Sequence, residues 1–134
     1  MAKPGVLETV TGFAALDEIG TMLERMWSAY DHVPLPVRTQ VGIAVGEIGA
    51  NIIEHAAQEG PVRLRFEVLV LRDEVRVFFT DHGSPAQIDL PGAAMPDQMA
   101  ESGRGLALAR AVLDRLSYTR SWANHWLLVS KRFA

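Results

Sequence analysis

Two polar side chains stand one helical turn apart in the stretch EIGANIIEHA, which runs from Glu47 to Ala56. On a helical wheel Glu47 and Asn51 lie about 40° apart, on a narrow polar stripe beside an apolar arc. A carboxylate can accept a proton from an attacking hydroxyl or water, and an amide oxygen is a hard, neutral ligand for Mg²⁺. The pair therefore fits either a solvated helix face or a shared, metal-assisted site.

A second candidate group is the aspartate in the segment FTDHG. Asp81 ends an apolar run and Gly83 turns the chain, so the carboxylate would stand at the edge of a sheet. There it could accept a hydrogen bond from an exocyclic amine. Alone this signal is weak, because Asp-x-Gly is also a common turn.

A third candidate is the glycine pair in Ser102-Gly103-Arg104-Gly105-Leu106. Glycines at a helix start expose backbone N–H groups, and the helix dipole favours phosphate there. The segment is no P-loop, since no Gly-Lys-Ser/Thr follows. It is no Rossmann fingerprint either, since Leu108 stands where the third glycine belongs.

The alternation of apolar and polar residues predicts the elements that position these groups. We expect a strand over 6–10, helices over 13–30 and 36–58, strands over 62–70 and 75–80, a helix opening at Gly103, and strands over 117–122 and 126–133. The prolines and missing periodicity of 86–102 predict a loop of a length that usually means function. This order predicts an α+β fold, a two-layer sandwich with helices on one face of a mixed, mostly antiparallel sheet.

The helix predicted over 36–58 should have three distinct sides. Its core-facing arc is expected to comprise Val37, Val41, Ala44, Val45, Ile48, Ile52 and Ala56. His55 falls inside this arc, so we expect a packed, hydrogen-bonded residue rather than a metal ligand. On a third side Gly42, Gly46 and Gly49 indicate a close approach to the backbone, for which the first helix is the candidate.

Length and composition narrow the class of protein. The chain has 134 residues, of which 49% are hydrophobic and 22% charged, and this predicts one globular domain over 1–134. It has no cysteine and a net charge of −3, which argues against disulfides, thiolate metal sites and a nucleic-acid-binding surface. The first residues lack the apolar core of a signal peptide, and no apolar run suits a membrane helix. We therefore expect a cytoplasmic protein.

Together and in this order, Glu47-x-x-x-Asn51, Asp81-x-Gly83 and Gly103-x-Gly105 resemble the N, G1 and G2 boxes of the GHKL (histidine kinase-like ATPase) superfamily, which includes gyrase, histidine kinases and MutL. The resemblance covers roughly 36–133 and implies the Bergerat ATP-binding fold. Within this superfamily the chain looks most similar to the stand-alone anti-sigma factor serine kinases. The features concerned are EIGANIIEHA, GRGLALARAVLDRLSY and the ending Lys131-Arg132-Phe133.

The resemblance implies ATP and Mg²⁺ as ligands and gives each box a role. Glu47 would be the catalytic base or polarising group, Asn51 the Mg²⁺ ligand and Asp81 the acceptor for the adenine amine. The implied nucleotide-binding residues are Asn51, Asp81, Gly83, Gly103, Arg104, Gly105 and Leu106. The glycines would let the lid, 86–102, approach the phosphates, and Arg104 would touch the γ-phosphate. Two departures are that no second glycine follows Gly83 and that Ala123-Asn124-His125 replaces a glycine-rich hairpin.

The implied activity is that of a protein serine/threonine kinase. Such a chain would bind a sigma factor, phosphorylate an anti-anti-sigma partner with a STAS domain, and pair as a homodimer. One alternative is an ATP-dependent switch without catalysis, and another is a stand-alone histidine-kinase-type ATP-binding domain. The roughly 35 residues before Pro36 are too few for a phosphoacceptor hairpin, although the acceptor could sit on another chain. A plain α+β interaction module without nucleotide is the last alternative.

Overall fold

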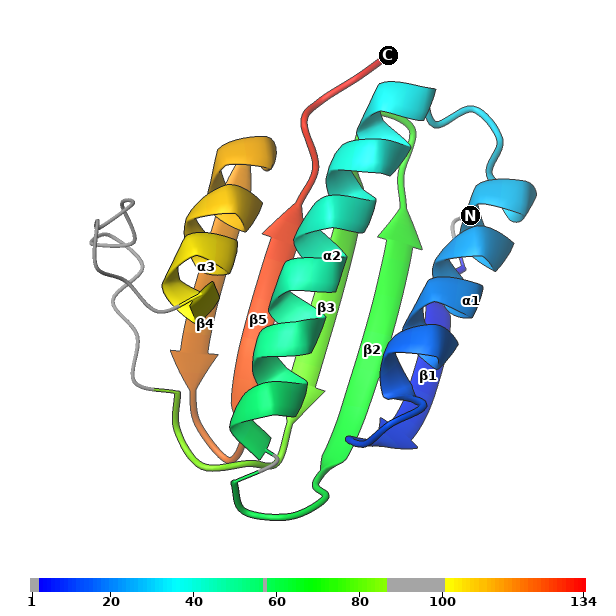
Figure 1. The fold of residues 1–134 in the computed structure, drawn as a ribbon. Coiled ribbons are helices and arrows are strands. Elements are labelled where there is room, and N and C mark those ends of the chain that lie inside the picture. The colour runs from blue at the N-terminus through cyan, green and yellow to red at the C-terminus, as the bar shows by residue number, and fades with distance from the viewer. Residues whose placement is uncertain (1–2, 57, 87–100) are drawn as a thin grey trace.

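The computed structural model of the protein describes residues 3–56, 58–86 and 101–134 (Figure 1). The elements are β1 Gly5–Val10, α1 Ala15–Ala29, α2 Leu35–Ala56, β2 Arg63–Val70, β3 Val75–Asp81, α3 Glu101–Val112, β4 Arg115–Arg120 and β5 Asn124–Val129. The expected order of strands and helices is confirmed. The helix expected at Gly103 already begins at Glu101, and the last two strands begin at 115 and 124 rather than at 117 and 126. Most of the expected loop, 87–100, lies outside the described residues.

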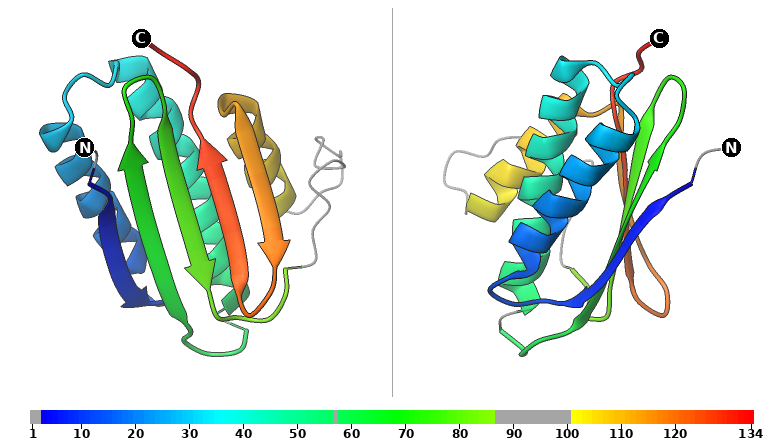
Figure 2. Two further views of the ribbon diagram at one scale, coloured as in Figure 1. Left: turned by 180° about the vertical axis from the view of Figure 1, so that it is seen from behind. Right: turned by 90° about the vertical axis from the view of Figure 1, so that its right-hand side faces the viewer.

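The strands form one sheet in the order β1-β2-β3-β5-β4, and every pairing in it is antiparallel. After β3 the chain passes through α3 and the edge strand β4, and β5 then returns to pair with β3. The described helices all cover one face of the sheet, and none of them lies on the opposite face (Figure 2). The expected α+β sandwich is therefore confirmed. Within the described ranges, no helix combines the length and the apolar character that a bilayer crossing requires.

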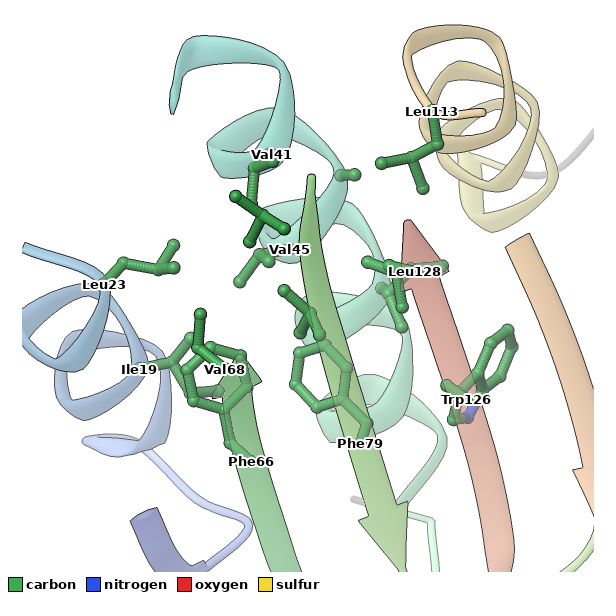
Figure 3. Close-up of a cluster of buried hydrophobic side chains, with 14 of the residues drawn as sticks. Ile19, Leu23, Val41, Val45, Phe66, Val68, Phe79, Leu113, Trp126 and Leu128 are labelled. Carbon is green, nitrogen blue, oxygen red and sulfur yellow. The ribbon is translucent and has the colours of Figure 1, made fainter. Parts of the chain in front are cut away.

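The core lies between the sheet and the three described helices. In β2 the inward positions are Leu64, Phe66, Val68 and Val70, all buried, as the alternation of apolar and polar residues predicts. The rings of Phe66 and Phe79 on the paired strands β2 and β3 are 5.0 Å apart between centroids (Figure 3). Burial of side chains of this size contributes about 1.5–3 kcal/mol each.

Helix α2 runs across the middle of the sheet and supplies the largest apolar face. All seven residues of the expected arc are buried. The expected close approach at the glycines is correct only at Gly49, where a Cβ would lie 3.2 Å from Leu16 Cδ2 of α1. A Cβ on Gly42 or Gly46 would meet no atom of the described chain within 4 Å. These two glycines therefore have no close neighbour in the described part of the chain, α1 included, and the expectation was wrong for them.

A glycine shapes the connection between α2 and β2. Gly60 has φ of 95°, a left-handed conformation that other residues adopt only at a steric cost. The chain reverses there and enters β2. Figure 1 places the C-terminal end of α2 and the end of β3 at the same edge of the molecule.

Candidate functional site

Glu47 and Asn51 lie on α2 as expected, one turn apart and half-buried. Neither side chain has a hydrogen bond or ion pair with any described residue. Helix α3 passes directly beside Glu47, because a Cβ on Gly105 would lie 2.4 Å from Glu47 Oε2 and 3.3 Å from its Cδ. The structure thus brings together two residues that the sequence separates widely, Glu47 and Gly105.

The first turn of α3 carries the remaining residues of the glycine segment. Since the helix begins at Glu101, Gly103 and Arg104 are among the first four residues, whose N–H groups lack helical acceptors. Gly105 follows them, so its contact with Glu47, rather than a free N–H, accounts for glycine there. Arg104 is exposed. Leu106 is 6% exposed and puts its side chain in the hydrophobic core.

Asp81 is a buried carboxylate at the end of β3, with 4% of its surface exposed. Its Oδ1 accepts a hydrogen bond of 3.0 Å from the Gly83 N–H and one of 2.9 Å from Asn124 Nδ2. A Cβ on Gly83 would lie 3.1 Å from the same oxygen. The expected neighbourhood of Asp81 and Gly83 is therefore present, and glycine lets the backbone N–H approach the carboxylate.

Asn124, Tyr118 and Arg120 complete this region, and none of them was predicted as a site residue. Asn124 is the cross-strand partner of both Asp81 and Arg120, and only 1% of it is exposed. Its Oδ1 accepts hydrogen bonds from the Tyr118 hydroxyl and from Arg120 Nη1. The available signal was a polar residue at an inward position of β5, ahead of Trp126 and Leu128. It was missed because the strand was expected to begin at Trp126.

The turn after β3 is also fastened to the loop after α2. Glu59 accepts hydrogen bonds from the backbone N–H of Ser84, at 3.1 Å, and from the Ser84 hydroxyl. No described contact joins Asp81 directly to Glu47 or Asn51. The two groups are connected through this Glu59–Ser84 contact and through the packing of α2 on β3.

His55 also lies at this end of α2, half-buried. Its Nε2 is buried and has no hydrogen-bond partner among the described residues. The expectation of a packed residue therefore agrees with the structure, whereas the expected hydrogen bond is absent at this nitrogen.

The fold and these three groups agree with one known family. A family model described as the histidine kinase-like ATPase domain matches residues 13–131, which is most of the chain. The chain belongs to the histidine kinase-like ATPase family. No curated protein matches it. Membership of this family indicates ATP binding and an ATP-dependent ATPase or kinase activity. It also confirms the superfamily that the three boxes predicted.

The side chains that could coordinate a metal ion fit an ion carried by the nucleotide better than an ion held by the protein alone. Among the residues described, no cluster of three or more His, Asp or Glu could hold a metal ion. Magnesium usually keeps several waters and uses one or two protein oxygens together with substrate phosphates. In this histidine kinase-like ATPase domain, Asn51 offers such an oxygen, because no described residue engages its amide.

Proposed function

We propose that this histidine kinase-like ATPase domain is a protein-serine kinase that binds a sigma factor, acts as a homodimer and phosphorylates a STAS-type anti-anti-sigma partner. The observation that supports transfer is the half-buried Glu47 carboxylate, which has no partner among the described residues and lies one turn from Asn51. The choice of partners rests on the similarity of EIGANIIEHA and GRGLALARAVLDRLSY to kinases of that type.

The proposed roles follow from the chemistry of each side chain. Asp81 would accept a hydrogen bond from the adenine amine, and Asn51 would give its amide oxygen to the metal. The N–H groups at the start of α3 would face phosphate, which the helix dipole favours. When bound, Mg-ATP supplies the γ-phosphoryl group and the metal neutralises phosphate charge.

Glu47 is the group that separates a kinase from a plain nucleotide-binding protein. It would orient the serine hydroxyl of the partner and accept its proton. The bond between the serine oxygen and the γ-phosphorus would form as the bond from the γ-phosphorus to the β-bridging oxygen breaks, so that ADP leaves. The phosphoserine then adds a charge of about −1.5 to −2 to the partner. That charge, placed on the docking surface, would release the phosphorylated partner.

The test is transfer of label from Mg-ATP to serine of a STAS-domain protein from the same organism. Glu47→Gln should bind ATP nearly normally but transfer roughly 10²- to 10⁴-fold more slowly, because a positioned base contributes that much. Asn51→Ala should lose both binding and transfer. Glu54→Gln is the matched control, since Glu54 is an exposed carboxylate on the same helix.

Two results would contradict this proposal. Transfer by Glu47→Gln at the parent rate would exclude Glu47 as the base. A parent protein that binds ATP but phosphorylates no partner would be a non-catalytic switch.

A further inference from the structure

Asn124 is a polar side chain in the core layer, and the groups around its amide are complementary to it in hydrogen bonding. Its Nδ2 faces acceptors: Asp81 Oδ1 at 2.9 Å, the Ser84 carbonyl at 2.8 Å and the Gly83 carbonyl at 3.4 Å. Its Oδ1 faces donors, the Tyr118 hydroxyl and Arg120 Nη1. The amide therefore has one orientation, because a flip would set donor against donor and acceptor against acceptor.

The two donors on Oδ1 are themselves held in place. The Tyr118 oxygen accepts the Ala86 N–H at 2.9 Å, so its own proton is directed to Asn124. The Tyr118 ring also packs against Trp126, with centroids 4.8 Å apart. Arg120 Nη1 donates to the Gly83 carbonyl at 2.8 Å. Asn124 itself is 1% exposed, so it cannot turn without breaking several bonds that water would not replace at its buried amide, and such a loss is costly.

This arrangement determines what Asp81 can present to a ligand. Both groups on Oδ1, the Gly83 N–H and Asn124 Nδ2, are donors, so Oδ1 acts as an acceptor. No described residue bonds to Oδ2, which is left to face a ligand as an acceptor too. A purine with an amine at C6 offers a donor to such an oxygen, whereas guanine and hypoxanthine offer a carbonyl there.

We propose that Asn124 is a positioning residue that sets base choice at the nucleotide site. By holding Asp81 as a fixed acceptor, it selects a 6-aminopurine over a 6-oxopurine. The inference rests on the proposed function only in taking Asp81 as the base-binding group, and it is independent of phosphoryl transfer. Tyr118 and Arg120 act through Asn124 by fixing its amide.

The experiment compares the affinities of ATP and inosine triphosphate by calorimetric titration. The two nucleotides differ only at C6 and the adjoining N1 proton. The parent protein should prefer ATP by roughly 10- to 100-fold, the worth of one hydrogen bond to a charged group. In Asn124→Leu, which has similar volume but no donor, Asp81 loses one of the two donors that fix its Oδ1 and is free to rotate, so the preference should fall below about threefold.

Two further variants keep the result interpretable. Tyr118→Phe leaves Arg120 alone to hold the amide and should give an intermediate preference. His125→Leu introduces leucine at the next position of β5, on the opposite face of the sheet. This variant should keep the parent preference for ATP. A general loss of stability would weaken the binding of both nucleotides alike and leave the ratio of their affinities unchanged.

Each outcome decides the inference. An unchanged ratio in folded Asn124→Leu overturns it, and if that variant does not fold, an unchanged ratio in Tyr118→Phe does so. A parent that binds both nucleotides equally overturns it while leaving the proposed kinase standing. If the parent protein binds neither nucleotide, the proposed nucleotide site is wrong, and the inference fails with it.

Discussion

Glycine at position 105 is explained by a contact with another helix rather than by a turn. Gly105 lies inside α3, and any Cβ there would collide with the Glu47 carboxylate of α2. The residue proposed as base is therefore held against a helix backbone. Its position depends on how closely the two helices approach.

Gly105→Ala should accordingly impair transfer more than ATP binding. The added methyl group must displace Glu47, and a misplacement of about 1 Å in a catalytic group can lower a rate by about 10²-fold. The measurement is single-turnover transfer beside calorimetric ATP affinity. Gly46→Ala is the control, because a Cβ on this α2 glycine meets no described atom within 4 Å. Parent-rate transfer by Gly105→Ala would show that the contact has no role.

Asp81→Asn should weaken ATP binding by about 1.5–3 kcal/mol, the worth of a hydrogen bond to a charged group. The two donors at Oδ1, Gly83 N–H and Asn124 Nδ2, would draw the new amide oxygen toward them. The new NH₂ group would then face the ligand, where the adenine amine needs an acceptor. Calorimetry checks this, and an unchanged ATP affinity in a folded variant would exclude Asp81 as the base-binding group.

At the scale of elements, α2 joins the core to the site, since one face carries Ile48 and the adjoining stripe carries Glu47. Ile48 is 0% exposed, so Ile48→Ala should lower the free energy of unfolding by about 2–5 kcal/mol. Ile43→Ala on the same helix is the control, because Ile43 is 38% exposed. Urea unfolding monitored by circular dichroism gives both values. Equal losses for the two variants would contradict the assigned faces.

The sequence predicted those elements that bury one face against the core. The apolar arc of α2 and the alternation of β2 are periodic signals, and the structure confirms both. The start of β5 was misplaced because Asn124, a polar residue, occupies an inward position of this strand. Asp81 and Gly83 were predicted as site residues because they lie two positions apart in the sequence. The contact between Asp81 and Asn124 could not be found, because it depends on the pairing of β3 with β5.

At the scale of the molecule, the segment after β5 covers the end that lies opposite the candidate site. Ser130 is 0% exposed and exchanges hydrogen bonds of 2.9 Å with the backbone of Val75. The Phe133 N–H donates to the Asp73 carbonyl, and the Phe133 ring lies 6.1 Å from that of His32 between centroids. This segment was expected to be strand throughout, but β5 ends at Val129. It instead fastens the β2–β3 turn to the connector between α1 and α2.

An ion pair at this covered end should make stability depend on acid. Arg132 Nη2 donates to Asp73 Oδ2 at 2.8 Å, and this hydrogen bond lowers the pKa of Asp73 in the folded protein. Because the folded pKa lies below the unfolded value of about 4, the stabilisation is fully present above pH 4. It is lost as the pH falls through the lowered pKa.

Asp73→Asn should therefore lower the melting temperature slightly at pH 7, and the difference from the parent should disappear in stronger acid. The effect is small because Arg132 is exposed and Asp73 is only partly buried, and salt should screen it. Melting curves from pH 7 to pH 2 measure the difference. In an Arg132→Ala background most of the effect of Asp73→Asn should be lost, because the hydrogen bond to Arg132 is the largest cause of the lowered pKa of Asp73. A difference that is the same at pH 7 and pH 2, or that is undiminished in that background, would show that the pair contributes nothing.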